Sequence, residues 1–217
     1  MAIAHDASTT PWARVNSGTS MTVAHTCSWT NRGIEVTVGT TGNVVTWVTY
    51  AGVSMTQIWS YSADGAGNGV TTWFLANPTS GSNNVVISTS VATTIMCHIV
   101  SYTGVNQSTP VGAVVTNWPT TTGTWTQTLT TTVDNSWLVM SWKGRSGNTI
   151  TAWSNTFVRR AVEVLFTWLF VADSNSAQTP TGSKSMTVTS SSQEFNGTMF
   201  ELIEASLSTF RPKVIIY

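Results

Sequence analysis

The feature that most constrains this chain is a repeated alternation, with a period of two residues, of mainly apolar and mainly polar side chains. Residues 21–29 place Met, Val, His, Cys and Trp at every second position, with Thr, Ala, Thr and Ser between them. A period of two residues indicates a β-strand with one buried face. The same alternation recurs at residues 34–38, 44–50, 53–61 and 85–89.

Turn-forming residues separate these segments, and the second half of the chain continues the pattern. Clusters that contain Gly, Asn or Pro lie at residues 31–33, 39–42, 64–69 and 77–82. Further strands are expected at residues 94–102, 125–132, 137–142, 158–172, 184–189 and 195–203. Short strands with such turns are typical of a sandwich, and no window has a strong helical period. We therefore predict an all-β protein, a single antiparallel, jelly-roll-like β-sandwich over residues 1–209 with extended terminal segments.

Charged residues are scarce in this chain. Nine Lys and Arg and nine Asp and Glu make up 8% of the 217 residues, and the formal net charge is zero. An ordinary soluble domain carries roughly 25%. A disordered, highly charged chain is excluded, and so is electrostatic binding to nucleic acid or to an anionic membrane surface. The 40 Thr and 26 Ser residues replace the missing charge and predict a surface rich in hydroxyl groups.

No arrangement of residues predicts catalysis, a metal site or a cofactor. His5, His25 and His98 lie in or beside strand-like segments, and no Gly-x-Ser-x-Gly nucleophile motif is present. Cys27 and Cys97 lie in apolar alternating segments, which favours buried thiols. A disulfide between them, or a zinc site that includes His25 and His98, are the less favoured alternatives. We expect a protein that is not an enzyme.

Tryptophan is frequent, with 11 copies. Seven lie in or at the ends of expected strands, and we expect most of them in the core: Trp29, Trp47, Trp59, Trp73, Trp137, Trp142 and Trp168. Four follow or precede Pro, or border Thr-, Gly- or Ser-rich segments, and are expected to be partly exposed: Trp12, Trp118, Trp125 and Trp153. Exposed aromatic rings mark contact sites, so these four are candidate ligand-binding residues that would stack on sugar rings. Packing inside the protein is the alternative for each.

Residues 210–217 differ in character from the rest of the chain. A basic Arg-Pro-Lys segment precedes Val-Ile-Ile-Tyr, a run of strong strand formers. Because Pro212 interrupts pairing continuous with residues 195–203, this segment is either the last strand of the sheet or an arm that pairs with a neighbour's edge. The candidate arm residues are Phe210, Pro212, Val214, Ile215, Ile216 and Tyr217.

Neither a secretory signal nor a membrane span is expected. Residues 1–6 lack a basic segment followed by an apolar stretch, which a secretory signal requires. The most apolar run, residues 161–172, is much shorter than the ~20 residues of a spanning helix. We expect synthesis in a host cytoplasm without membrane insertion.

Several segments of the first half resemble a known group of proteins. They are Gly18-Thr-Ser-Met-Thr-Val-Ala-His-Thr-Cys-Ser28, Val48-Thr-Tyr-Ala-Gly-Val-Ser-Met-Thr56, Trp73-Phe-Leu-Ala-Asn-Pro-Thr-Ser-Gly-Ser-Asn-Asn-Val-Val-Ile87 and Ser101-Tyr-Thr-Gly-Val105. The group is a loosely defined set of β-sandwich domains in bacterial surface proteins and in phage and metagenomic virion-type proteins. The later segment 131–139 is also similar. The resemblance implies a β-sandwich and a virion or surface setting, and it carries no catalytic residue.

We therefore expect a non-enzymatic structural protein of a phage virion: a capsid decoration, fibre or tail component. Its expected partners are further copies of itself in a homo-oligomer, a major capsid or tail protein, and a cell-surface glycan, with no nucleic acid. Its expected location is the virion, and an extracellular location is the alternative. Two other functions stay open. One is a carbohydrate-binding module or adhesin that uses exposed Trp, and the other is a subunit of a self-assembling extracellular filament.

Overall fold

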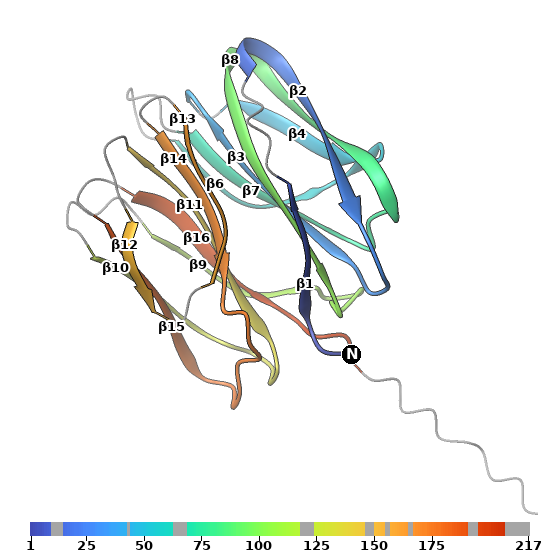
Figure 1. The fold of residues 1–217 in the computed structure, drawn as a ribbon, viewed down its shortest axis with the longest axis vertical. Coiled ribbons are helices and arrows are strands. Elements are labelled where there is room, and N and C mark those ends of the chain that lie inside the picture. The colour runs from blue at the N-terminus through green and yellow to red at the C-terminus, as the bar shows by residue number, and fades with distance from the viewer. Residues whose placement is uncertain are drawn as a thin grey trace, which may run out of the picture.

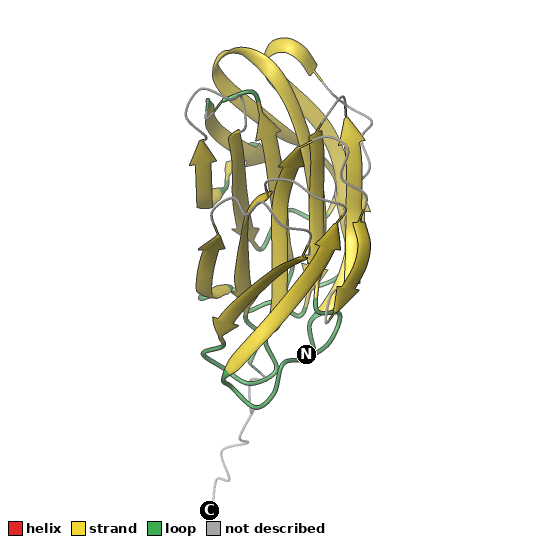
Figure 2. Cartoon of the chain, turned by 90° about the vertical axis from the view of Figure 1, so that its left-hand side faces the viewer, coloured by secondary structure: helices red, strands yellow, loops and turns green. Residues whose placement is uncertain are grey.

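The structure, a computed structural model, describes residues 1–9, 15–42, 44–62, 69–117, 124–145, 150–154, 157–164, 167–190 and 195–206. These residues form sixteen strands and no helix (Figures 1 and 2). The strands are β1 Ala4–Thr9, β2 Val15–Cys27, β3 Gly33–Thr40, β4 Val45–Tyr50, β5 Val53–Ser54, β6 Thr56–Ser62, β7 Gly69–Ala76, β8 Gly81–Thr103, β9 Val111–Asn117, β10 Thr124–Thr130, β11 Trp137–Arg145, β12 Ile150–Ser154, β13 Phe157–Val164, β14 Thr167–Asp173, β15 Ser183–Ser190 and β16 Phe195–Leu202. Among the described residues, no helix has the length and apolar character needed to cross a membrane.

The strands form four stacked layers (Figure 1). Layer 1 contains β2, the first half of β8, β4 and β5, and layer 2 contains β1, the second half of β8, β3, β7 and β6. Layer 3 is the sheet β13-β14-β11-β16-β9, and layer 4 is the sheet β10-β15-β12. The predicted all-β, antiparallel sandwich is confirmed. It has four layers because the second half of the chain, from β9 onward, adds two layers to the two of the first half.

Strand β8 joins layer 1 to layer 2. It is 23 residues long. Its residues 81–88 pair with β2, and its residues 95–102 pair with β3. Between these two parts the pairing with β2 is irregular, and Ser90–Ala92 is exposed where the strand bends from one layer to the other (Figure 1). The sequence predicted two strands here, and the structure joins them into one bent strand.

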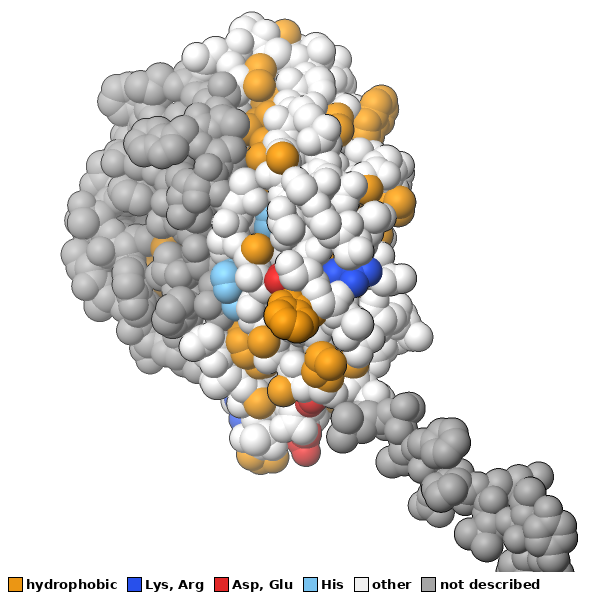
Figure 3. All heavy atoms as spheres, turned by 45° about the vertical axis from the view of Figure 1, so that its right-hand side comes forward, with side chains coloured by type: hydrophobic (Ala, Val, Ile, Leu, Met, Phe, Trp, Pro, Cys, Tyr) orange, Lys and Arg blue, Asp and Glu red, His pale blue; other side chains and the backbone are white. Residues whose placement is uncertain are grey.

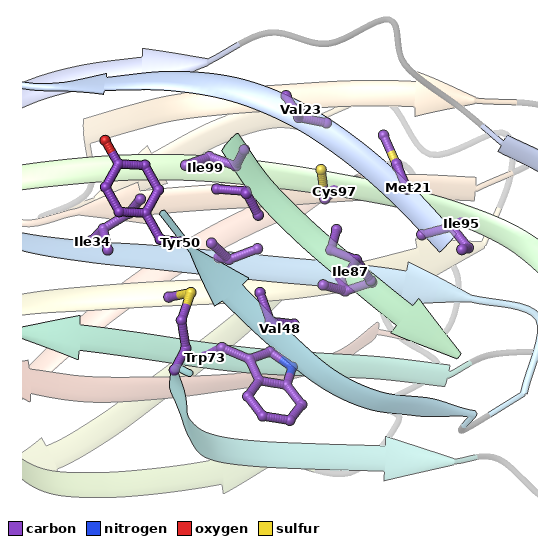
Figure 4. Packing of buried hydrophobic residues seen from close by; sticks show 14 of the residues in the cluster. Met21, Val23, Ile34, Val48, Tyr50, Trp73, Ile87, Ile95, Cys97 and Ile99 are labelled. Atoms are coloured by element: carbon purple, nitrogen blue, oxygen red, sulfur yellow. The ribbon is translucent and has the colours of Figure 1, made fainter. Parts of the chain in front are cut away.

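The interior between layers 1 and 2 holds the apolar side chains that the alternation predicted. In β2, Met21, Val23, His25 and Cys27 are buried, and Thr22, Ala24 and Thr26 between them are exposed. Figure 4 shows Met21 and Val23 in one cluster with Ile87 and Ile95. The buried face of residues 21–27 is therefore confirmed.

Strand β3 is buried along its whole length. Ile34, Val36 and Val38 belong to the cluster between layers 1 and 2. Glu35 and Thr37 lie on the opposite face of β3, which layer 3 covers. An alternating strand ordinarily exposes its polar face, so the burial of this face is a consequence of the stacked second half.

The two halves of the chain share the interior between layers 2 and 3. Its apolar cluster contains Val100 of the first half together with Val139 and Phe200 of the second. Tyr102 Oη donates a hydrogen bond to Asp173 Oδ2 across it, at 3.1 Å. The division into one domain and an arm stays a prediction, because the arm lies outside the described residues.

Two further sequence predictions are tested by the fold. Cys27 and Cys97 are both free and buried, which confirms the favoured prediction of thiols. Burial raises the pKa of the Cys97 thiol to about 12. The prediction of one strand over residues 158–172 was wrong, because β13 and β14 pair antiparallel there. Residues 165 and 166 between them are Leu and Phe, which gave no signal for a turn.

Candidate functional site

Trp125 is the candidate ligand-binding tryptophan whose side chain the structure describes. It is 2% exposed and packs edge-to-face on Trp142, with ring centroids 5.2 Å apart. The prediction that Trp125 is partly exposed was wrong, because β10 turns it into the interior between layers 3 and 4. Trp73, Trp137 and Trp142 are buried, as predicted.

The other sequence candidates cannot be placed by their side chains. Trp153 pairs with Val188 in the register of β12 and β15, and its side chain lies outside the described part of the chain. The remaining candidates also lie outside the described residues: Trp12, Trp118, Phe210, Pro212, Val214, Ile215, Ile216 and Tyr217.

Two tryptophans that were expected in the core are exposed. Trp29 is 78% exposed and Trp47 is 56% exposed, so this prediction was wrong for both. Trp29 follows the end of β2 in a turn, with a backbone φ of 61°. In β4, the register with β8 shifts between Val45 and Trp47, so Trp47 points outward while Val48 and Tyr50 are buried. Alternation alone predicted neither the end of β2 nor this bulge.

A hollow of about 350 Å³, the Trp29 hollow, lies at the exposed indole ring. It is lined by Met1, Ala4, His5, Asp6, Trp29, Thr30 and Thr103. Asp6 Oδ2 accepts hydrogen bonds from the Ser28 backbone N–H at 2.8 Å and the Ser101 hydroxyl at 2.9 Å, which fix the carboxylate. An exposed aromatic ring beside a carboxylate, an imidazole and hydroxyl groups offers both the apolar face and the polar groups that a sugar ring requires.

A larger hollow, the edge groove, has a volume of about 630 Å³ and lies between the edges of layers 2 and 3. It is lined by Thr56, Gln57, Ile58, Phe74, Leu75, Ala76, Gln107, Ser108, Thr109, Pro110, Val111 and Val114. Among the described strands, β6 pairs only with β7, and β9 pairs only with β16. Each is therefore an edge strand whose outer backbone groups have no strand partner.

The edge groove is uncharged, and its lining combines apolar side chains with the polar side chains of Thr56, Gln57, Gln107, Ser108 and Thr109. None of its lining residues is ionisable, and Ile58, Phe74, Val111 and Val114 give it an apolar surface. Val114 is 44% exposed. Apolar side chains beside an unpaired strand edge suit a strand from another chain, because its backbone can pair while its side chains are buried.

An acidic hollow of about 430 Å³ adjoins the edge groove, and Thr109 lines both. The acidic hollow is lined by Asn106, Thr109, Val133, Asp134, Asn135, Ile203, Glu204, Ala205 and Ser206. Its two carboxylates already have partners: Asp134 Oδ1 accepts the Thr181 N–H at 2.6 Å, and Glu204 Oε1 lies 3.7 Å from the Met1 ammonium group. Both retain acceptor capacity for a basic group.

Glu201 holds in place the walls of the edge groove and of the acidic hollow. Burial opposes its ionisation, but hydrogen bonds from the Thr132 hydroxyl and from the backbone of Ala113, Thr132 and Val133 lower its pKa. A Cβ atom added to Gly112 would lie 2.3 Å from Glu201 Oε2. Glycine at this position therefore lets β9 approach the carboxylate.

Besides the Tyr102–Asp173 pair, the titratable side chains of Glu35, His98 and Lys143 are enclosed between layers 2 and 3. Burial raises the pKa of Glu35 to about 8 and lowers the pKa of Lys143 to about 8. Lys143 Nζ donates to the carbonyls of Thr40, at 2.6 Å, and Gly69, at 3.3 Å. None of the three lines a hollow described above, so their contacts serve the packing of the two halves.

Metal-ligating residues do not gather in the part of the chain that the structure describes: no group of three His, Cys, Asp or Glu could hold an ion. That the protein is not an enzyme stays a prediction.

Two chemically different surfaces are therefore present: an apolar edge groove with an acidic neighbour, and an aromatic hollow with polar groups. Sequence reasoning missed both, because strand edges and hollows arise from pairing between distant segments. Comparisons with family models, with curated proteins and with solved structures returned no match for this chain. The chemistry of these two surfaces is accordingly the basis for the function proposed below.

Proposed function

We propose that this chain is a non-enzymatic structural protein of a phage virion, a capsid decoration, fibre or tail component that assembles with copies of itself. The observation that carries the proposal is the edge groove, where two edge strands meet at an apolar surface. Natural proteins ordinarily protect such edges with charge, with Pro or with a covering segment. An edge left apolar and open supports pairing with another chain.

The charge-poor surface supports self-association. Figure 3 shows a face on which the backbone and uncharged polar side chains predominate, with scattered apolar side chains and few charged ones. On layer 4, exposed hydroxyl pairs join β10 to β15: Thr126 and Thr187 at 2.9 Å, and Thr128 and Ser185 at 2.7 Å. Since the formal net charge is zero, electrostatic repulsion between copies is weak. The resemblance of the first half to virion-type domains supports the virion setting.

Sedimentation-velocity ultracentrifugation over a range of protein concentrations tests self-association. We expect a discrete oligomer, and a monomer at every concentration would contradict the proposal. Electron microscopy of the same sample separates a discrete oligomer from a filament, the alternative assembly. The virion setting predicts that the gene lies beside capsid, portal or tail genes. It also predicts that mass spectrometry detects the protein in purified particles, and absence of the protein there would contradict the virion setting.

The Trp29 hollow favours a second candidate function, glycan binding by a module or adhesin. The indole is 78% exposed and stands beside the fixed Asp6 carboxylate and His5. This arrangement moves the sugar-binding hypothesis away from buried Trp125 to a tryptophan that the sequence assigned to the core. Both functions are compatible in one virion protein that contacts a cell surface.

A glycan array with the unaltered chain and the Trp29→Ala variant tests this candidate. We expect binding that Trp29→Ala abolishes, because the stacking surface is lost. Trp47→Ala is the matched control, since Trp47 is also exposed and lies outside the hollow. Absence of glycan signal, or equal loss in both variants, would contradict a site at Trp29.

A further inference from the structure

We propose that the edge groove and the acidic hollow together form the receptor for residues 210–217 of a second copy of this chain. The inference rests on the proposed self-association and names the surface that performs it. It joins a segment that the sequence singled out to a surface that only the structure reveals.

The backbone of the receptor is suited to strand addition. β6 and β9 each have one strand neighbour among the described residues, and the edge groove lies between them. Residues 214–217 are Val-Ile-Ile-Tyr, all strong strand formers. An added strand gains backbone hydrogen bonds at the edge and buries alternate side chains on Ile58 and Val114.

The order of charge along the arm matches the order of charge along the receptor. The arm has Arg211 and Lys213 followed by four residues without charge. The receptor has Asp134 and Glu204 in the acidic hollow, followed across Thr109 by the uncharged edge groove. Docking in this direction places both basic side chains near the carboxylates and the uncharged strand of residues 214–217 along the edge groove, with alternate side chains facing it.

The lengths also agree. Eight extended residues span about 26 Å, and an edge strand of seven residues spans about 23 Å. Strands β6 and β9 have seven residues each. Residues 214–217, about 13 Å when extended, therefore fit along part of an edge strand, and residues 210–213 are left to reach the acidic hollow.

We assign the receptor to the arm of a second copy because, within one subunit, the chain that leads to the arm begins at the acidic hollow itself. Ser206, the last described residue, lines the acidic hollow. Residues 207–210 are Leu-Ser-Thr-Phe, and Ser208 is the one residue among them of a type that favours tight turns. Docking in its own subunit would require the chain to reverse within these four residues, whereas a neighbour's arm arrives without that constraint.

The first experiment compares oligomers by sedimentation velocity. We expect Val114→Glu and deletion of residues 210–217 each to weaken association by about tenfold or more, because a charge or a missing strand removes the apolar contact. Val91→Glu is the matched control, since Val91 is 54% exposed at the bend of β8 and lines none of the three hollows. Circular dichroism checks that each variant is folded.

Mixing the two weakened chains tests exchange between copies. The Val114→Glu chain keeps its arm, and the deleted chain keeps its groove. We expect the mixture to form a one-to-one complex that neither chain forms alone. A mixture that stays monomeric would overturn the assignment of the groove to a second copy.

A peptide experiment separates failure of this inference from failure of the proposed function. A fluorescein-labelled peptide of residues 207–217 should bind the chain that lacks residues 210–217, and Arg211→Glu with Lys213→Glu in the peptide should weaken binding about tenfold. If the unaltered chain associates but Val114→Glu has no effect and the peptide does not bind, the receptor assignment is overturned and self-association stands. If the unaltered chain is monomeric and the peptide binds only the deleted chain, the arm occupies its own subunit, which overturns the second-copy occupant. If nothing associates and no peptide binds, both proposals fail.

Discussion

Glu35 is a carboxylic acid enclosed between layers 2 and 3. Its Oε1 accepts a hydrogen bond from the Thr37 hydroxyl, and its Oε2 has no hydrogen-bond partner among the described residues. Burial raises its pKa to about 8, although the hydrogen bond from Thr37 acts in the opposite direction. The side chain therefore stays protonated at neutral pH, which avoids the cost of a buried, unpaired charge.

This titration predicts how stability depends on pH. Between 4.5, its ordinary pKa, and about 8, folded Glu35 holds a proton that the unfolded chain has lost, so stability falls as pH rises. Burial lowers the pKa of His25 to about 4, against the opposing charge of Asp6. Between about pH 4 and 6.5 the unfolded chain therefore holds a proton on His25 that the folded protein has lost, so this residue makes stability rise with pH over that range only. Between pH 6.5 and 8 we expect the free energy of unfolding to fall by about 1–2 kcal/mol.

Urea denaturation at pH 6.5 and at pH 8 measures this change. Glu35→Gln should remove the decline, because the amide does not ionise. Titration of Lys143 does not interfere with this measurement. Burial lowers the pKa of its ammonium group only to about 8, so its effect on stability lies above that pH. An equal decline in the variant would show that another group titrates.

The close approach of Gly112 to Glu201 leads to a second prediction, about the stability of a single-residue variant. Gly112→Ala places a methyl group 2.3 Å from Glu201 Oε2, so the carboxylate or β9 must move. We expect a loss of about 1–3 kcal/mol in the free energy of unfolding, as for overpacking elsewhere. Thr116→Ala, at an exposed position of the same strand, should change it by less than about 0.5 kcal/mol. Equal values for the two variants would contradict the close approach.

At the scale of the elements, the sequence predicted strands wherever local alternation decides the structure. The buried face of β2 is an example, because Met21, Val23 and Cys27 follow a period of two. Features set by distant partners escaped prediction. The bulge that exposes Trp47 and the wall of the edge groove that β9 forms with β16 depend on pairing between segments far apart in the sequence. The hairpin of β13 and β14 is local, but residues 165 and 166 between the two strands, Leu and Phe, carry no turn signal.

Strand β8 offers a direct test of how burial differs along one element. Ile87 is fully buried in the interior between layers 1 and 2, whereas Val91 is 54% exposed at the bend. We expect Ile87→Ala to cost about 2–5 kcal/mol and Val91→Ala less than about 0.5 kcal/mol in the free energy of unfolding. Chemical denaturation of the two variants measures both, and a large loss for Val91→Ala would show that the bend is packed.

At the scale of the whole molecule, the two halves of the chain are joined by a packed interior rather than by a linker alone. Val100, Val139 and Phe200 form part of one apolar cluster across layers 2 and 3, and Lys143 of layer 3 donates to carbonyls of layer 2 residues. Removing either half would expose this interior to water. The halves should therefore unfold together.

Hydrogen exchange measured by mass spectrometry at increasing denaturant concentrations tests this coupling. We expect peptides from β3 and β11 to reach the same free energy of opening, because both strands line the shared interior. A lower value confined to the second half would show that layers 3 and 4 open independently, and would favour two domains over the single domain predicted from the sequence.

The position of β8 also bears on how the chain folds while it is being synthesised. β1 and β2 pair only with β8 among the described strands, and β8 ends at Thr103. The part of β8 that pairs with β2 ends at Ile95, so a ribosome must add 68 residues after Cys27 before β2 has a complete partner. During this interval the apolar face of β2 that carries Met21 and Val23 is not covered by its completed sheet. The protein is therefore most prone to aggregate or to bind chaperones while its first half is being synthesised.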